Sequence, residues 1–129
     1  MTQKSQNFTL VSGLWDLSRK GRDFDDHYLP RFKEFLKIDA PMILFLPKTL
    51  HDLVWEIRDN SNTFIKEFEL EDVKRLYAPF WDKTQEIRTS KEWLGLTGAD
   101  GWLKSSPQAS LEYYNPIVMS KMFMLHDAS

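Results

Sequence analysis

The sequence predicts an α/β fold, a three-layer arrangement in which helices flank a mostly parallel sheet. Three apolar segments with the length and composition of strands, residues 8–17, 40–48 and 62–70, alternate with segments of helical periodicity. Parallel neighbours in a sheet need long crossover connections, and helices supply them. Since 129 residues are the size of one domain, we expect a single α/β domain over residues 1–129.

The first strand and the first helix are predicted close to the N-terminus. The run FTLVSGLWDL, residues 8–17, is apolar, contains a glycine and precedes charged residues, as in a buried strand with its exit loop. In residues 23–37, aromatic and leucine side chains recur at helical spacing. Asp25 or Asp26 is available as the N-cap of this helix, and Pro30 is tolerated in its first turn.

The middle of the chain predicts a second strand, a second helix and a third strand. Residues 40–48, APMILFLPK, form a short apolar run between two prolines, which is typical of a strand buried on both faces. Residues 49–59 have helical periodicity, and Thr49 with Asp52 makes a capping-box-like pair. Residues 62–70 alternate apolar and charged side chains and predict a half-exposed or edge strand.

The last third of the chain predicts a helix, a loop and a final helix. Helical spacing returns in residues 71–88, where Pro79 is expected to bend or split the helix. Residues 95–111 hold three of the five glycines and predict the longest loop. The final helix is expected to begin with Asn115 as its N-cap and Pro116 in its first turn. Its apolar surface is made by Ile117, Met119, Met122, Phe123 and Leu125.

Composition narrows the class of protein. Hydrophobic residues make up 42% and charged residues 28%, as in a globular chain. The 17 Lys and Arg are dispersed among 19 Asp and Glu, so no basic stripe indicates nucleic-acid binding. The absence of cysteine excludes disulfides and a cysteine nucleophile. Because the first seven residues are polar and no apolar run is long enough for a membrane span, we expect a soluble cytoplasmic protein.

The segment after the first strand, WDLSRKGR, is the first place to look for a ligand site, because ligands bind at the carboxyl ends of parallel strands. The Asp16 carboxylate can accept from a base or a ribose hydroxyl, and the Arg19 guanidinium can hold a phosphate. The alternative is a strand-end ion pair or solvated loop charges. Lys121, in an otherwise apolar helix, either snorkels to solvent or points a cation into a site.

Other motifs have ordinary structural interpretations. DFDDH contains an Asp-x-Asp pattern, Asp23 to Asp25, of the kind that chelates a divalent metal. It precedes an amphipathic helix, so helix capping is the favoured interpretation. The three histidines are far apart in sequence, and no metal site is assigned. GADGW, residues 98–102, is either a turn or a glycine loop that contacts a ligand, with Trp102 as a stacking platform. The common phosphate-loop, hydrolase and zinc motifs are absent.

Three blocks follow one another along the chain: FTLVSGLWDLSRKGR, PMILFLP and YYNPIVMSKMFMLHDAS. In combination they resemble the bacterial HtrL/YibB family, also called the WlaTC/HtrL glycosyltransferases, and the resemblance extends over essentially the whole chain in order and spacing. The family's aromatic-Asp-aliphatic-Gly-Arg pattern is matched by Trp15, Asp16, Leu17, Ser18 and Arg19, with Ser18 in place of the glycine. The family's last block is matched by Tyr114, Pro116, Ser120 and Lys121, and Met119 replaces an asparagine.

The resemblance implies the Rossmann-like nucleotide-binding half of an A-type glycosyltransferase fold. In that family the acidic metal-binding segment follows the helix that ends this chain, so residues 1–129 are expected to be the N-terminal, nucleotide-sugar-binding portion of a longer enzyme. A complete relative would use Mn²⁺ or Mg²⁺ and transfer the sugar of a nucleoside diphosphate sugar to a hydroxyl of a glycan or lipopolysaccharide-type acceptor. The resemblance implies that Asp16 contacts the nucleoside, Arg19 the phosphates and Lys121 the diphosphate or donor sugar. No catalytic residue is assigned.

A second hypothesis belongs to another class of protein. Because the chain lacks the acidic strand and ends in an apolar helix, it could be a non-catalytic α/β module that binds a partner or forms a homodimer. Nucleotide affinity distinguishes the two hypotheses.

Overall fold

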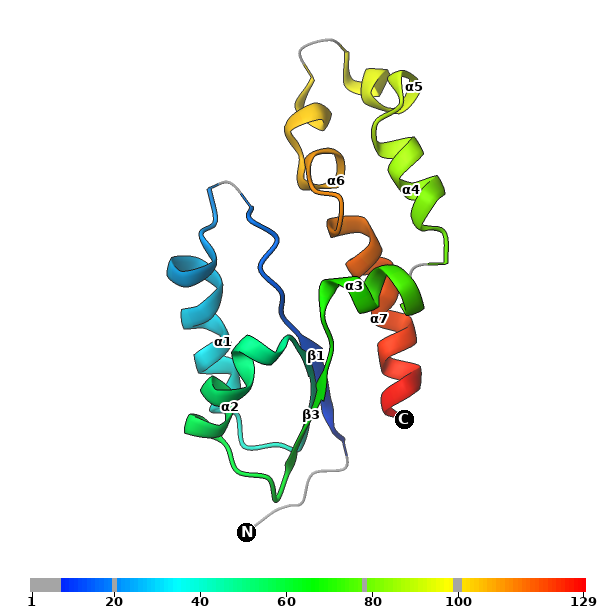
Figure 1. Ribbon diagram of the computed structural model, residues 1–129. Coiled ribbons are helices and arrows are strands. Elements are labelled where there is room, and N and C mark those ends of the chain that lie inside the picture. Colours follow the sequence, from blue (N-terminus) through cyan, green and yellow to red (C-terminus); the bar gives the residue numbers. More distant parts are fainter. Residues whose placement is uncertain (1–7, 20, 78, 99–100) are drawn as a thin grey trace. The chain divides into compact units, whose positions relative to one another are not determined.

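The computed structural model describes residues 8–19, 21–77, 79–98 and 101–129. The polar N-terminal segment and the two central residues of the predicted Gly-Ala-Asp-Gly turn lie outside the described residues. The chain divides into two compact units (Figure 1). Unit 1 comprises Met1–Glu69 and Met124–Ser129, and unit 2 comprises Leu70–Phe123.

Unit 1 is built on a three-stranded parallel sheet with the order β1-β2-β3. β1 spans Leu10–Gly13, β2 spans Met42–Leu46 and β3 spans Thr63–Glu67. Gly13 pairs with Phe45, so β1 and β2 are in register near their carboxyl ends. The predicted α/β class with a parallel sheet and flanking helices is confirmed, and the third predicted strand is an edge strand.

Two helices cover one face of this sheet (Figure 1). α1, Leu29–Leu36, follows a π-helical turn and connects β1 to β2. α2, His51–Ile57, follows a 3-10 turn and connects β2 to β3. Apolar side chains of both helices pack on β2, and burying each one contributes roughly 1.5–3 kcal/mol. The buried members of this core are Phe32, Leu36, Met42, Leu44, Leu46, Leu50 and Val54.

The opposite face of the sheet carries Phe45 and its β3 partner Lys66. The ammonium group of Lys66 lies 5.8 Å from the centroid of the Phe45 ring. Lys66 also forms an ion pair with Asp127 in α7, Tyr114–Ala128. The last turn of α7 therefore flanks the sheet on the side opposite to α1 and α2.

Arg58, which follows α2, connects three parts of unit 1. Its guanidinium is buried and donates to the carbonyl oxygens of Leu36, Ile38 and Ala40, at the end of α1 and in the link to β2. Its Nε donates to Oγ1 of Thr63 at the start of β3, 2.6 Å away. One side chain thus fixes the end of α1 against the starts of β2 and β3.

Unit 2 consists of short helical segments and most of α7. The Trp81 and Tyr113 rings pack with their centroids 4.9 Å apart. Arg88 Nη1 donates to the carbonyl of Ala109 at 2.6 Å, so α4 is held to the segment that precedes α7. The helices before α7 are α3 (Leu70–Asp72), α4 (Trp81–Arg88), α5 (Lys91–Leu94) and α6 (Pro107–Ser110).

Three predicted helix caps are wrong. The first helical segment is capped by Asp23, which accepts from the backbone N–H groups of Asp25 and Asp26, the two residues predicted as caps. Thr49 makes no capping hydrogen bond, because it lies inside the 3-10 turn that precedes α2. Asn115 lies inside α7, and its side-chain amide donates to the carbonyl of Gln108 at 2.8 Å.

Two other predictions concern the interval between β3 and α7. The helix predicted around Pro79 is split, since a π-helical turn ends at Tyr77 and α4 begins at Trp81. The prediction of a long loop over residues 95–111 is wrong. This interval contains two 3-10 turns and α6, which is capped by the hydroxyl of Ser106.

α7 has 15 residues and carries several apolar side chains that are exposed to solvent. Within the described ranges, no helix has both the length and the apolar content that crossing a bilayer requires.

Candidate functional site

The carboxyl ends of the three strands form one edge of the sheet in unit 1. The chain leaves β1 at Gly13, β2 at Leu46 and β3 at Glu67. Side chains that follow these positions lie where parallel sheets usually bind their ligands.

Trp15 anchors the exit of β1. It is buried, and its indole Nε1 donates to the carbonyl oxygen of Phe68, just after β3, at 2.7 Å. The Trp15 and Phe68 rings meet edge to face with centroids 6.3 Å apart, and Phe68 meets Phe45 in the same way at 5.8 Å. A Cβ at Gly13 would lie 2.5 Å from the Trp15 ring, so only glycine leaves room for this packing. Because the Trp15 side chain is held in this way, the backbone position of the next residue, Asp16, is fixed.

Asp16 is exposed at this edge and organises the turn that follows. Its Oδ1 accepts from the backbone N–H of Ser18 at 2.8 Å, as in an Asx-turn. Ser18 has φ of +56°, in the left-handed region that favours glycine. The Oδ2 of Asp16 has no hydrogen-bond partner in the described chain, so it can accept from a ligand.

Arg19 lies three residues further on and is half-buried. Its Nη1 donates to the hydroxyl of Tyr28 at 3.1 Å, and this contact orients the guanidinium. The His27 ring packs edge to face on Tyr28, with centroids 4.9 Å apart. Partial desolvation and the guanidinium groups of Arg31, Arg22 and Arg19 lower the pKa of His27. The Tyr28 side chain thus links Arg19 to His27 after the exit of β1.

Glu69 and His51 also lie at this edge, and sequence reasoning assigned them no role. The Oε2 of Glu69 accepts from the backbone N–H of Lys48 at 2.8 Å, so it caps the turn after β2 where Thr49 was expected to do so. The Nε2 of His51 lies 3.2 Å from the carbonyl oxygen of Leu46. The only sequence signal for Glu69 is its place after the third strand, because its partner is 21 residues away.

Lys121 is an exposed residue of α7. It belongs to unit 2, whereas Asp16 and Arg19 belong to unit 1. The structure therefore brings Asp16 and Arg19 into one turn region and places Lys121 on a separate unit. Exposure of the side chain agrees with the snorkelling interpretation of this residue.

The acidic segment has a structural role. Asp23 uses its carboxylate to cap a helix, which supports the capping interpretation of the Asp-x-Asp pattern. In the described part of the chain, no group of three or more His, Asp or Glu side chains is placed to hold a metal ion. Gly98 has φ of +84°, and its carbonyl accepts from the N–H of Gly101 at 3.1 Å. Trp102 after it is exposed.

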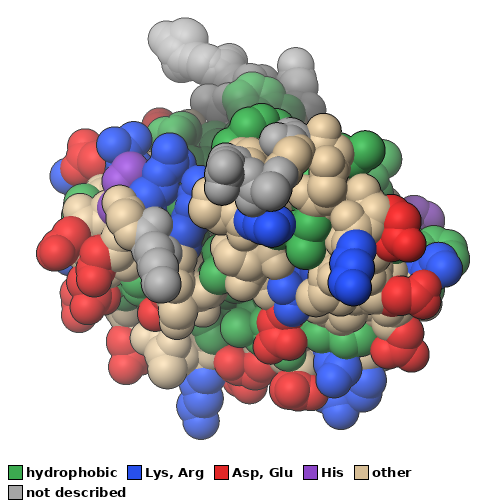
Figure 2. All heavy atoms as spheres, turned by 90° about the horizontal axis from the view of Figure 1, so that it is seen from above, with side chains coloured by type: hydrophobic (Ala, Val, Ile, Leu, Met, Phe, Trp, Pro, Cys, Tyr) green, Lys and Arg blue, Asp and Glu red, His purple; other side chains and the backbone are tan. Residues whose placement is uncertain are grey.

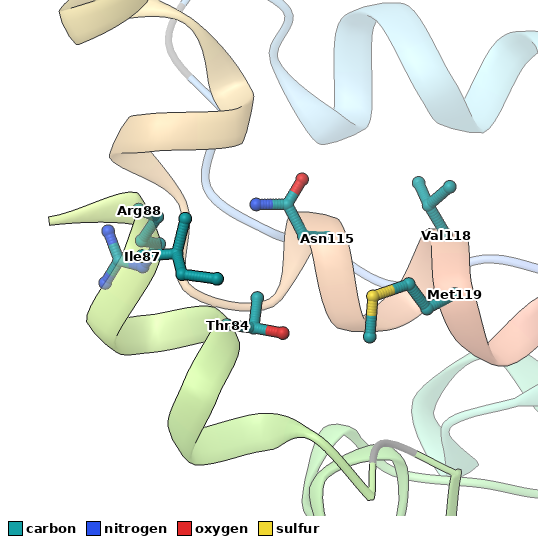
Figure 3. A pocket seen from close by; sticks show the side chains of 6 residues that line it. All are labelled: Thr84, Ile87, Arg88, Asn115, Val118 and Met119. Atoms are coloured by element: carbon teal, nitrogen blue, oxygen red, sulfur yellow. The ribbon is translucent and has the colours of Figure 1, made fainter. Parts of the chain in front are cut away.

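Unit 2 contains a pocket of about 240 Å³ between α4 and α7 (Figure 3). The Arg88 guanidinium at its rim is already engaged, since Nε donates to Oε1 of Gln85 at 2.6 Å and Nη1 to the carbonyl of Ala109. The surface of the pocket is mostly apolar. Its lining residues are Thr84, Ile87, Arg88, Asn115, Val118 and Met119.

Comparisons with known proteins were made at three levels. The chain matches no protein-family model, no curated protein and no solved structure.

Proposed function

We propose that this chain binds a nucleoside diphosphate sugar at the carboxyl edge of its parallel sheet. The complete protein would be a glycosyltransferase of the HtrL/YibB type that transfers the sugar to a hydroxyl of a glycan or lipopolysaccharide-type acceptor in the cytoplasm. The observation that carries the proposal is the exit of β1. There, a buried Trp15 fixes the chain, Asp16 presents a carboxylate oxygen that has no hydrogen-bond partner among the described residues, and Arg19 follows three residues later.

The fold of unit 1 supports this proposal. Three parallel strands in sequential order, joined by α1 and α2 on one face, resemble one mononucleotide-binding half of a Rossmann-like sheet. The left-handed conformation of Ser18 gives further support, because a glycine at this position in the resembling family would adopt it without strain.

Each proposed role follows from the chemistry of the side chain. The Oδ2 of Asp16 accepts from a base N–H or a ribose hydroxyl. The guanidinium of Arg19 holds the phosphate oxygens of the nucleotide. In the transfer, the acceptor oxygen bonds to the anomeric carbon and its proton passes to solvent, while the bond between the anomeric carbon and the diphosphate oxygen breaks and the nucleoside diphosphate leaves. Cations that hold the diphosphate stabilise the negative charge that develops on it.

A divalent ion would add to this stabilisation in a complete enzyme. The described residues do not fit such an ion, because no acidic or histidine cluster forms among them. The proposal therefore assigns nucleotide binding, and no metal-dependent step, to this chain.

Nucleotide titration tests the proposal. In isothermal titration with UDP and GDP in the presence of Mn²⁺, we expect binding of at least one of them, and we expect Arg19→Ala to weaken it about tenfold. Arg75→Ala and Lys83→Ala are the controls, since each removes one cation from an exposed ion pair of unit 2. Absence of binding by the folded protein, or unchanged affinity after Arg19→Ala, would rule the proposal out.

The alternative function, a module that associates with itself or a partner, is favoured by the surface of α7. Met122 is 72% exposed, and neighbouring apolar side chains of the same helix are also exposed. Exposed apolar patches on folded proteins often mark interaction sites. The other members of this patch are Val118, Met119, Phe123 and Leu125.

Light scattering tests this alternative. If the α7 surface mediates self-association, the measured mass is close to twice 15.3 kDa, and Met122→Glu returns the protein to a monomer because it buries a charge in the interface. Leu96→Glu, at an exposed apolar residue in a 3-10 turn of unit 2, should leave the mass unchanged. A stable dimer without nucleotide affinity favours the module, whereas a monomer that binds UDP or GDP favours the transferase.

A further inference from the structure

The outer edge of β1 carries backbone hydrogen-bonding groups that pair with nothing in the described chain. The N–H of Leu10 donates to the carbonyl oxygen of Pro41 at 2.9 Å, just before β2. In a parallel ladder, alternate residues direct their N–H and C=O groups towards the neighbouring strand, so Val11 and Gly13 direct theirs away from β2. Both residues are partly exposed, and no described residue donates to or accepts from these outward groups.

The same edge lacks the side chains that usually keep an exposed strand from pairing. Edge strands of natural proteins commonly carry charged residues or proline, which disfavour the addition of another strand. No charged residue and no proline occurs between Lys4 and Asp16. Elsewhere the chain is rich in charge, and Figure 2 shows acidic and basic side chains distributed over much of the surface visible there. β1 is therefore an edge that favours strand addition.

The opposite edge of the sheet has a different character. β3 carries Lys66 and Glu67, and the ammonium group of Lys66 is engaged by Asp127. β3 also begins at Thr63, which is buried, so little of its first residue is open to another strand. The two edges are therefore not equivalent, and β1 is the edge suited to pairing.

We propose that β1 pairs with β1 of a second copy of this chain, so that two three-stranded sheets become one continuous sheet. A two-fold axis perpendicular to the sheet makes the two copies of β1 antiparallel and closes the contact. With this axis at Val11, the residue lies opposite its own counterpart, and Thr9 lies opposite Gly13 of the second copy. These residues direct their backbone groups outward, so each pair can exchange both of its hydrogen bonds.

The side chains of this segment suit such a self-pairing. Side chains alternate between the faces of a strand, so Phe8, Leu10 and Leu14 share one face. Leu10 and Leu14 pack against the core beneath α1 and α2, whereas Phe8 is 58% exposed. In the proposed register, Phe8 lies opposite Leu14 of the second copy, which covers its ring. Because the segment is uncharged, two identical strands meet without bringing like charges together.

Light scattering with variants of Val11 tests the interface. We expect a mass close to twice 15.3 kDa, and Val11→Lys should give the mass of the monomer because two ammonium groups would lie opposite each other. Val11→Pro should have the same effect, since it removes an outward N–H and leaves the ladder to β2 intact. Phe64→Lys is the control: it adds a charge at an exposed residue of β3 and should leave the mass unchanged.

Two further measurements need no variant that breaks the interface. The chain has no cysteine, so Val11→Cys supplies a single thiol. Opposite residues of a hydrogen-bonded antiparallel pair have Cα atoms about 5.5 Å apart, within the range that a disulfide spans. We expect mild oxidation to link two chains of Val11→Cys but not of Phe64→Cys. In hydrogen exchange of the unsubstituted chain, the amides of Val11 and Gly13 should be as protected as the bonded amide of Leu10.

The outcomes separate this interface from the other proposals. A dimer that persists in both Val11→Lys and Val11→Pro overturns it. A dimer that Met122→Glu dissociates also overturns it and favours self-association through α7. A monomer whose Val11 and Gly13 amides exchange rapidly overturns it as well, as does assembly beyond the dimer, because the two-fold contact is closed. UDP titration stays a separate test, since the nucleotide proposal uses Asp16 and Arg19 and does not require a dimer.

Discussion

Replacement of Arg58 by methionine should lower the free energy of unfolding by about 3–5 kcal/mol, one of the two largest effects expected in this chain. Arg58 is only 9% exposed, and its guanidinium donates to three backbone carbonyls and one hydroxyl. The carbonyls lie in and after the last turn of α1, where backbone acceptors lack partners within the helix. Methionine keeps the apolar stem but removes every donor, so buried acceptors lose their hydrogen bonds.

A conservative variant and a control make this prediction specific. Arg58→Lys retains the charge, but an ammonium cannot span Thr63 and the carbonyls as a planar guanidinium does, so we expect a loss of about 2 kcal/mol. Arg75→Met removes an exposed arginine from an i,i+3 ion pair and should cost no more than about 0.5 kcal/mol. Urea denaturation followed by circular dichroism measures all three. A change below about 1 kcal/mol in Arg58→Met would show that water replaces the guanidinium without cost.

Replacement of Gly13 by alanine should lower the free energy of unfolding by about 2–3 kcal/mol. The new Cβ would lie 2.5 Å from Cη2 of Trp15 and 2.8 Å from the carbonyl oxygen of Phe45. Neither the Trp15 ring nor the Phe45 oxygen can move easily to make room for this atom. The Trp15 ring is held by its hydrogen bond to Phe68, and the Phe45 oxygen is part of the central strand. Glycine at this position is therefore a packing requirement, unrelated to backbone conformation.

The same substitution should also affect the candidate site, because Trp15 fixes the exit of β1 that carries Asp16 and Arg19. At a temperature where Gly13→Ala remains folded, we expect UDP affinity to fall together with stability. Gly95→Ala is the matched control, since a Cβ there meets no atom within 4 Å and stability should change by less than about 0.5 kcal/mol. In a Trp15→Leu background, Gly13→Ala should cost less, and thermal unfolding of the four proteins yields the coupling energy. Equal costs in both backgrounds would contradict the proposed clash.

The elements of unit 1 could be predicted because their signals are local. The apolar run between Pro41 and Pro47 predicts β2, and alternation along residues 62–70 predicts the edge strand β3. Residues 49–59 predict α2 by their 3.6-residue periodicity. Each of these patterns reflects burial of one face or both faces of a single segment, and burial of this kind is encoded within ten residues or so.

The candidate site was predictable only in outline. Its place after β1 follows from the general behaviour of parallel sheets, and Asp16 and Arg19 were assigned from that place and from the family resemblance. The roles of Trp15 and Glu69 were not predictable, because their partners lie 53 and 21 residues away in the sequence. The pattern of apolar residues along a short segment contains no information about a hydrogen-bond partner so distant in the sequence.

By itself, the sequence determined the α/β class, the strands β2 and β3, and the position of the first candidate residues, since periodicity and apolar runs depend on neighbours along the chain. Only the tertiary structure decided which acceptors Arg58 satisfies, why position 13 must be glycine, and that Arg19 contacts Tyr28. These features depend on contacts between segments far apart in sequence or on the shape of an irregular turn. The physical reason is that hydrogen bonds and steric exclusion act over a few ångströms in space, whatever the separation along the chain.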